Sequence, residues 1–141
     1  MTNSSTTGGH GTAATRHLVD LSNDECWDLL RGTAVGRLAW NGTDGPTVVP
    51  VNFAVTTDGI DVRTTAYSAV AREADDGPVS FQADHLDPVT RTGWSVLAHG
   101  HVQIDWSFGR VDAPEIDVWP TGPRSLRLHV EIEQISGRRL A

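Results

Sequence analysis

Arg63, Thr64 and Ser68 are the residues of this sequence whose types and spacing most directly suggest binding chemistry. Arg63 and Thr64 end a short β-branched run, and residues 66–74 that follow are rich in helix formers, so Ser68 falls at a predicted helix start. A guanidinium donates paired hydrogen bonds to phosphate oxygens, and hydroxyl groups at a helix N-terminus add further donors. The three side chains therefore predict an anion site at a strand-to-helix junction.

Other chemistries lack the residues that they need. The 11 basic residues include no lysine, so no lysine Schiff base can form with a carbonyl substrate or with pyridoxal phosphate. No G-x-S-x-G elbow or obvious carboxylate dyad supports hydrolysis. Cys26 is the single cysteine and lies in an amphipathic stretch, which favours a packed small hydrophobe over a nucleophile. Redox chemistry would therefore need a bound cofactor.

His99 and His101 flank Gly100 and are the candidate metal-binding pair. One intervening residue in a strand places both rings on one face, but the sequence offers no third ligand beside them. We therefore predict histidines at an interface or a surface, and no metal site.

Charge and composition limit the partners and the location. The formal net charge of −7 argues against nucleic acid, because phosphate neutralisation needs clustered basic residues. No apolar run approaches the roughly 18 residues of a membrane span, no secretory signal is present, and the single cysteine suits a reducing compartment. We expect a cytoplasmic protein with a disordered tail over residues 1–16 and one domain over residues 17–141.

The remaining pattern predicts short helices and six strands. Ser22 and Glu25 form a capping-box sequence for a helix that stops at Gly32. Period-two patterns and turn residues indicate strands over 35–40, 47–55, 60–64, 79–84, 94–106 and 126–132, with a loop at 85–93 and an end to the last strand at 137–139. Pro50 indicates an edge position or bulge, and Gly100 a bend. These elements favour a mainly β, antiparallel barrel.

A set of motifs in this order is similar to a known family. The motifs are Leu21-Ser22 with Glu25-Cys26-Trp27, Gly36-Arg37-Leu38-Ala39, Pro50-Val51-Asn52-Phe53, Arg63-Thr64, Val79-Ser80-Phe81, Gly93-Trp94-Ser95-Val96, Trp119-Pro120-Thr121-Gly122 and Gly137-Arg138-Arg139. Together they resemble the small actinobacterial proteins related to pyridoxamine 5′-phosphate oxidase. The resemblance runs from about Leu18 to the C-terminus.

The resemblance implies a six-stranded antiparallel split β-barrel that forms a homodimer and binds flavin mononucleotide (FMN) between its subunits. It implies a flavin-dependent oxidoreductase acting on a small acceptor. The cofactor-binding residues carried over by position are Pro50, Val51, Asn52 and Phe53 along the ring, Arg63, Thr64 and Ser68 at the phosphate, Trp94 and Ser95 from the partner-facing strand, and Trp119 and Arg124 at the border.

Ala69 departs from the pattern of the family. Relatives commonly carry a lysine or arginine after the residue equivalent to Ser68, whereas Ala69 and Val70 stand here. Either Arg72 or Arg91 replaces the missing charge, or the cofactor differs, since related branches bind a deazaflavin coenzyme, heme or no known ligand. The alternative functions are a non-catalytic module that binds or senses a deazaflavin, a flavin or heme, and a split-barrel dimer with a vacant site. The sequence also lacks the further basic residues that would hold the phosphate of pyridoxamine 5′-phosphate, so we do not expect vitamin B6 oxidation.

Overall fold

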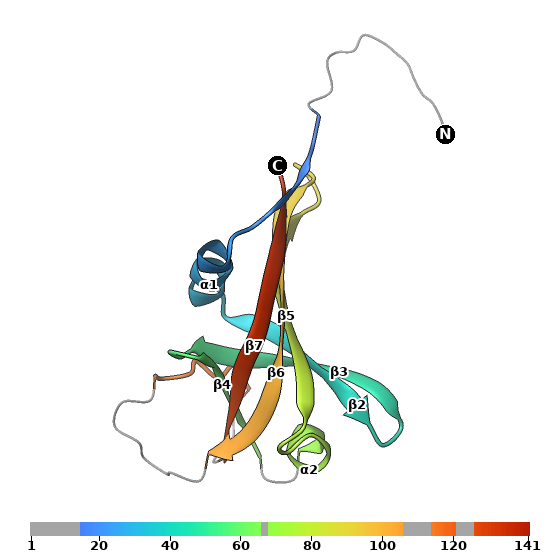
Figure 1. The fold of residues 1–141 in the computed structure, drawn as a ribbon, viewed down its shortest axis with the longest axis vertical. Coiled ribbons are helices and arrows are strands. Elements are labelled where there is room, and N and C mark those ends of the chain that lie inside the picture. The colour runs from blue at the N-terminus through green and yellow to red at the C-terminus, as the bar shows by residue number, and fades with distance from the viewer. Residues whose placement is uncertain (1–14, 66–67, 106–113, 121–125) are drawn as a thin grey trace.

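The computed structural model describes residues 15–65, 68–105, 114–120 and 126–141. Its elements are β1 (Leu18–Asp20), α1 (Asn23–Arg31), β2 (Val35–Gly42), β3 (Gly45–Val55), β4 (Gly59–Thr64), α2 (Ala69–Glu73), β5 (Pro78–Asp87), β6 (Thr92–Asp105) and β7 (Leu126–Leu140) (Figure 1). Most of the expected N-terminal tail, residues 1–14, lies outside the described part. No helix within that part is long and apolar enough to cross a membrane.

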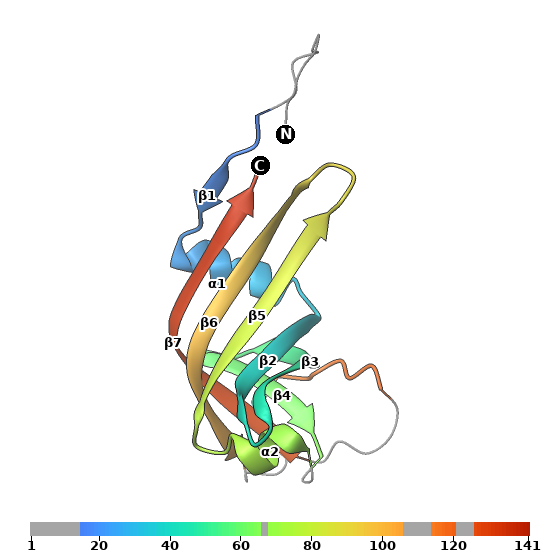
Figure 2. The same cartoon turned by 90° about the vertical axis from the view of Figure 1, so that its right-hand side faces the viewer.

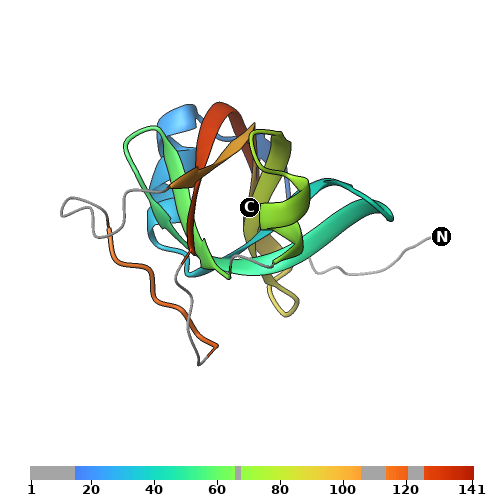
Figure 3. The same ribbon diagram turned by 90° about the horizontal axis from the view of Figure 1, so that it is seen from below.

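Six strands close into an antiparallel ring. Their order is β7-β4-β3-β2-β5-β6, and β6 returns to pair with β7. Figure 3 looks along this ring, and Figure 2 shows β5, β6 and β7 extending beyond it as a long arm. The predicted six-stranded split barrel with short helices is confirmed. The structure adds β1, which pairs with the end of β7 and whose three exposed residues are too few to show a period.

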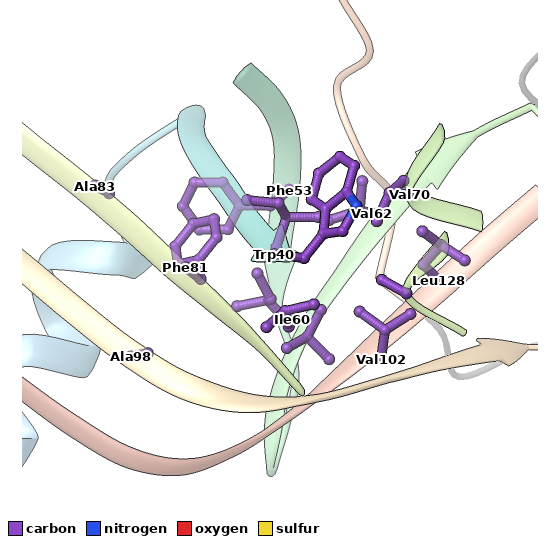
Figure 4. Packing of buried hydrophobic residues seen from close by; sticks show 14 of the residues in the cluster. Trp40, Phe53, Ile60, Val62, Val70, Phe81, Ala83, Ala98, Val102 and Leu128 are labelled. Atoms are coloured by element: carbon purple, nitrogen blue, oxygen red, sulfur yellow. The ribbon is translucent and has the colours of Figure 1, made fainter. Parts of the chain in front are cut away.

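The inward faces of the strands form one apolar core. Alternate residues of β7, namely Leu126, Leu128 and Val130, are at most 4% exposed, as a strand with one buried face requires. Phe53 of β3 and Phe81 of β5 meet edge to face with their ring centroids 4.7 Å apart (Figure 4). This arrangement is a favoured one for aromatic pairs because it brings a positive ring edge to a negative ring face.

Helix α1 begins and packs as its sequence predicts. The Ser22 hydroxyl accepts a hydrogen bond from the Glu25 backbone N–H, and the Glu25 carboxylate accepts one from the Ser22 N–H. These hydrogen bonds lower the pKa of the Glu25 carboxyl. Cys26 and Leu30 face inward and belong to the core, so Cys26 is a buried hydrophobe as predicted, and burial raises the pKa of its thiol.

The predicted loop over residues 85–93 is wrong. Strands β5 and β6 pair as far as Asp87 and Thr92, which leaves four residues, 88–91, in the turn. Arg91 adopts a φ of 58° there. Gly93 lies within the paired strands: a Cβ atom there would lie 2.2 Å from the His85 carbonyl oxygen, and its φ of 156° is one that other residues rarely adopt. The turn-forming residues therefore exaggerated the length of the loop.

The long strands show one confirmed expectation and one error. The register of β6 against β7 shifts between His99 and Gly100, so Gly100 marks the predicted irregularity. The last strand, in contrast, continues through residues 137–139 to Leu140, because β6 and β1 pair with both of its edges there. Glycine and arginine residues at 137–139 led to the prediction that the strand ends there.

Replacement of Gly100 by alanine tests ring closure. The new Cβ would lie 1.8 Å from the Glu131 carbonyl oxygen, so the two strand backbones must separate. We expect Gly100→Ala to lower the free energy of unfolding by about 2 kcal/mol, measured by urea denaturation. Gly32→Ala is the control, because its Cβ would lie 3.8 Å from the nearest atom. Equal midpoints for the two variants would contradict the close approach.

Candidate functional site

A cavity of about 320 Å³ lies beside β3, β4 and the start of α2. Six of the residues predicted to bind a cofactor line it, namely Pro50, Val51, Asn52, Arg63, Thr64 and Ser68. The remaining lining residues are Trp40, Val49, Val62, Thr65, Ala69, Val70, Val118 and Pro120. Most of these are apolar, so the cavity combines an apolar wall with a polar end.

The β3 wall of the cavity is paired on one side only. Residues 45–52 pair with β2, and pairing with β4 begins at Phe53. Pro50 therefore stands at a locally unpaired edge, as the sequence predicts, and its missing N–H costs no ladder hydrogen bond on the open side. This gap between β3 and β4 leaves the peptide groups of the wall accessible to a ligand.

Asn52 fixes the edge of the cavity through its side-chain amide. Its Nδ2 donates to the Ala34 carbonyl at 3.3 Å, and its Oδ1 accepts from the Trp119 backbone N–H at 2.9 Å. Trp119 is thus held beside the cavity with its side chain 64% exposed. The neighbours of Trp119, Val118 and Pro120, supply part of the wall.

The polar end contains the predicted anion-binding groups. Arg63 is exposed at the end of β4, and Ser68 is the N-cap of α2, where its hydroxyl oxygen accepts from the Ala71 N–H at 3.3 Å. The hydroxyl proton of Ser68 is still available for donation to a ligand. Among the described lining residues Arg63 alone is charged. Ala69 also lines the cavity, at the position where the family resemblance led us to expect a basic residue.

Trp40 contributes a buried aromatic side chain to the cavity lining. Only 5% of its surface is exposed, and it lies near Val62 and Val70 in Figure 4. Its indole N–H donates to the Glu73 carboxylate at 3.1 Å, and this hydrogen bond is the main cause that lowers the pKa of Glu73. A buried tryptophan with a satisfied N–H is a rigid flat surface.

Four predicted residues lie elsewhere or outside the described chain. Phe53 packs in the core rather than lining the cavity. Trp94 and Ser95 lie on the arm, where they pair with Arg139 and Arg138, so within one chain they do not reach the cavity. Arg124 falls outside the described residues.

Neither arginine considered as a replacement for the missing charge lines the cavity. Arg91 lies in the β5–β6 turn, which Figures 1 and 2 place at the opposite end of the molecule from α2. Arg72 is an exposed residue of α2 itself.

The two strand histidines have separate partners. The His99 ring bonds to the Ser80 hydroxyl at 2.8 Å, and His101 contacts the Glu133 carboxylate at 2.9 Å. Within the described ranges, no three His, Cys, Asp or Glu side chains gather in a way that could hold a metal ion.

A buried ionic cluster on the outer face of β4 and β7 was missed by sequence reasoning. Asp61 is fully buried, and Arg127 donates to it from Nε at 2.7 Å. His129 lies 2.7 Å from its other oxygen and also contacts Asp58 at 3.1 Å. The sequence analysis identified the strand over residues 60–64 but did not single out Asp61, which alternates with the buried Ile60 and Val62. The available signal was the opposite charge of Arg127 and His129 at alternate positions of the pairing strand.

Two opposing effects act on the Asp61 carboxyl. Burial raises its pKa, but hydrogen bonds from His129 and Arg127, together with their Coulombic attraction, outweigh the burial and leave the pKa below its usual value. The carboxylate is therefore ionised and fully paired at neutral pH.

Comparison with known proteins identifies the family. The family model described as pyridoxamine 5′-phosphate oxidase matches residues 22–139, which is most of the chain. The chain belongs to this family. The Mycobacterium tuberculosis protein Rv0080 is 38% identical over 90 residues, which are 60% of this chain and 59% of that protein.

Solved structures agree with this family assignment. The chain resembles an FAD-binding protein of Mycobacterium smegmatis, with a TM-score of 0.69 and 27% identity over 89% of this chain and 100% of that one. A Corynebacterium glutamicum structure named for pyridoxamine 5′-phosphate oxidase gives a TM-score of 0.74 at 22% identity, covering 87% of this chain and 98% of that one. The second likeness concerns the fold.

The ionic cluster predicts a pH-dependent stability. Because the Asp61 pKa is lowered by folding, its stabilisation is present above the unfolded value of about 3.9 and is lost as the pH falls through the folded value. We expect Asp61→Asn to lower the free energy of unfolding by about 3 kcal/mol near neutral pH, because Arg127 loses its buried partner. The difference from the native protein should shrink below about pH 4.

Denaturant titrations at several pH values measure this dependence. Asp28→Asn is the matched control, because it removes a carboxylate that is 78% exposed. A destabilisation by Asp61→Asn that stays constant down to the acid limit would contradict the ionised state of Asp61.

Proposed function

We propose that the cavity beside β3, β4 and α2 binds a flavin nucleotide. The observation that carries this proposal is the convergence of an apolar wall with Arg63, Thr64 and Ser68 at one end. Such a combination fits a ligand with a planar aromatic ring and a phosphate group. The family of the chain and its 27% identity to an FAD-binding protein support the same ligand class.

The residues present fit the parts of this ligand. Arg63 offers a charged fork to phosphate oxygens, and the hydroxyls of Thr64 and Ser68 offer neutral donors. Pro50 to Asn52 offer the backbone of an open strand edge to the ring. The Asn52 side chain is already engaged with Ala34 and Trp119, so it acts on the shape of the wall.

FMN is the flavin that we propose, because the polar end offers one guanidinium for one terminal phosphate. The M. smegmatis relative binds FAD, so the two nucleotides must be compared directly. A bound flavin would supply hydride or electron transfer to a small planar acceptor. The described lining residues include no carboxylate, histidine or lysine, so the contribution of the chain is binding and orientation.

The absorption spectrum of freshly purified protein tests cofactor binding. We expect flavin bands, or their appearance with quenched flavin fluorescence when FMN or FAD is added. A protein that shows no flavin bands and binds neither nucleotide would refute the proposal.

A non-catalytic module that carries or senses a flavin, a deazaflavin or heme is a second candidate. Ala69 favours it, because the phosphate end then carries only one basic side chain. Turnover with a reduced nicotinamide donor separates the two functions. Sustained oxidation of the donor by the flavin-loaded protein supports an oxidoreductase, and binding without turnover supports a carrier.

We also propose a homodimer whose partner subunit supplies Trp94 and Ser95 to the site. Within one chain these residues lie away from the cavity. The arm that carries them also exposes apolar side chains, including Leu97 at 41% and Leu86 at 66%. Sedimentation should give a dimer, and a monomer at all concentrations would overturn both the assembly and the shared site.

The phosphate role of Arg63 gives a selective prediction. Arg63→Ala removes the charged donor, so we expect the dissociation constant of FMN to rise about tenfold or more, with little change for riboflavin. Arg31→Ala removes the same charge from an exposed residue paired with Asp28 and should leave both constants unchanged. Fluorescence titration measures them. An equal loss for FMN and riboflavin in Arg63→Ala would remove the phosphate role.

A further inference from the structure

Residues 114–120 form part of the cavity wall although they belong to no helix or strand. Val118 and Pro120 line the cavity, and the segment lies outside the strand ring on the side of β3 and β4 (Figures 2 and 3). No strand ladder fixes such a segment, so its position depends on individual hydrogen bonds from neighbouring side chains.

Among the residues that the structure describes, two side-chain hydrogen bonds hold the segment near its two ends. The Trp119 N–H donates to the Asn52 side-chain oxygen at 2.9 Å. The Pro114 carbonyl accepts from Arg127 Nη2 at 2.7 Å, which is a short and charge-assisted hydrogen bond. One anchor belongs to the cavity itself, and the other belongs to β7.

The Arg127 anchor is itself rigidly held. Its Nε donates to Asp61 at 2.7 Å, its side chain is 11% exposed, and Asp61 is not exposed at all. The second oxygen of Asp61 is taken by His129, which also contacts Asp58. A planar guanidinium that is hydrogen-bonded to a carboxylate on one side presents its other N–H groups in a fixed direction. The buried carboxylate thus determines where the Pro114 carbonyl is held.

We propose that Asp61 and Arg127 are positioning residues that hold the 114–120 segment in place as a wall of the cofactor cavity. This inference rests on the proposed function for its effect on binding. Neither side chain lines the cavity, so each acts through the segment rather than by touching the ligand.

If Asp61 and Arg127 acted on the site through their charges alone, Asp61→Asn would change FMN affinity in the opposite direction. Arg127 lies directly across from Arg63 in the β4–β7 register, and Asp61 neutralises Arg127. Removal of the Asp61 charge therefore makes the surroundings of Arg63 more positive. If charge alone mattered, Asp61→Asn would tighten FMN binding, whereas a displaced wall weakens the binding of FMN and riboflavin alike.

Amide hydrogen exchange in the ligand-free protein tests the anchor without any flavin. Arg127→Lys keeps the positive charge, but an ammonium group lacks the planar fork that joins Asp61 to the Pro114 carbonyl. We expect exchange at the Trp119 amide to become about tenfold faster, while Val62 in β4 stays protected. Arg16→Lys is the matched control, because Arg16 is exposed and its guanidinium donates to the Thr90 carbonyl in the distant β5–β6 turn, and it should exchange as the native protein does.

Asn52→Ala removes the other anchor at a half-buried position and should accelerate exchange at the Trp119 amide similarly. Asp61→Asn is the variant with the greatest risk of unfolding, because it leaves Arg127 without its carboxylate partner. If Asp61→Asn does not fold, Arg127→Lys and Asn52→Ala still test the anchor.

Binding titrations complete the test. In Arg127→Lys and Asp61→Asn we expect the dissociation constants of riboflavin and FMN to rise together by about tenfold. Native exchange at Trp119 in folded Arg127→Lys, unchanged flavin affinity despite faster exchange, or tighter FMN binding in Asp61→Asn would each overturn the inference. If the native protein binds no flavin, the proposed function fails, and native exchange at Trp119 in Arg127→Lys would separately overturn the anchor.

Discussion

Closure of the ring at β7 is the constraint on which the rest of the structure depends. The first half of β7 pairs with β4 on one edge and with β6 on the other, and its second half continues along β6 with β1 beside it. Two glycines permit the closure. A Cβ at Gly59 would lie 1.9 Å from the Val130 carbonyl oxygen, and one at Gly100 would lie 1.8 Å from that of Glu131. Side chains at either position would force the three backbones apart.

The same closure creates both the cavity and its support. Pairing of β4 with β7 sets Asp61 opposite His129 and Arg63 opposite Arg127. The outer face of this pair thereby acquires a carboxylate that neutralises Arg127. Meanwhile β3 and β4 are hydrogen-bonded as neighbouring strands over only three residue pairs, which leaves the earlier residues of β3 open toward the cavity. The pairing of β4 with β7 therefore orders the ionic cluster, and the short pairing of β3 with β4 leaves the cavity wall open.

The sequence predicted the barrel because its signals are local, and it missed what long-range pairing decides. Alternation in residues 126–132, the capping box at Ser22 and Glu25, and the edge signal of Pro50 each depend on neighbours in the chain. Burial of Asp61 depends on residues 66 and 68 positions away, so the local pattern of the strand gave no sign of it. Gly93 was assigned to a loop for a similar reason, because the close approach that requires a glycine there is to His85 on the neighbouring strand β5. The grouping of Arg63, Thr64 and Ser68 could be predicted because strand and helix are consecutive.

The charge balance of the cavity explains why the position of its wall matters. The whole chain carries a net charge of −7, and Arg63 is the one charged side chain among the described lining residues. A phosphate ligand that meets one guanidinium gains less from Coulombic attraction than one that meets two, so a larger share of its affinity must come from hydroxyl donors and ring contacts. Ring contacts depend on close packing and fall off with small displacements. In the proposed flavin site, alanine in place of the expected basic residue at position 69 would therefore shift recognition toward Trp40, the open edge of β3, and the segment that we propose Asp61 holds through Arg127.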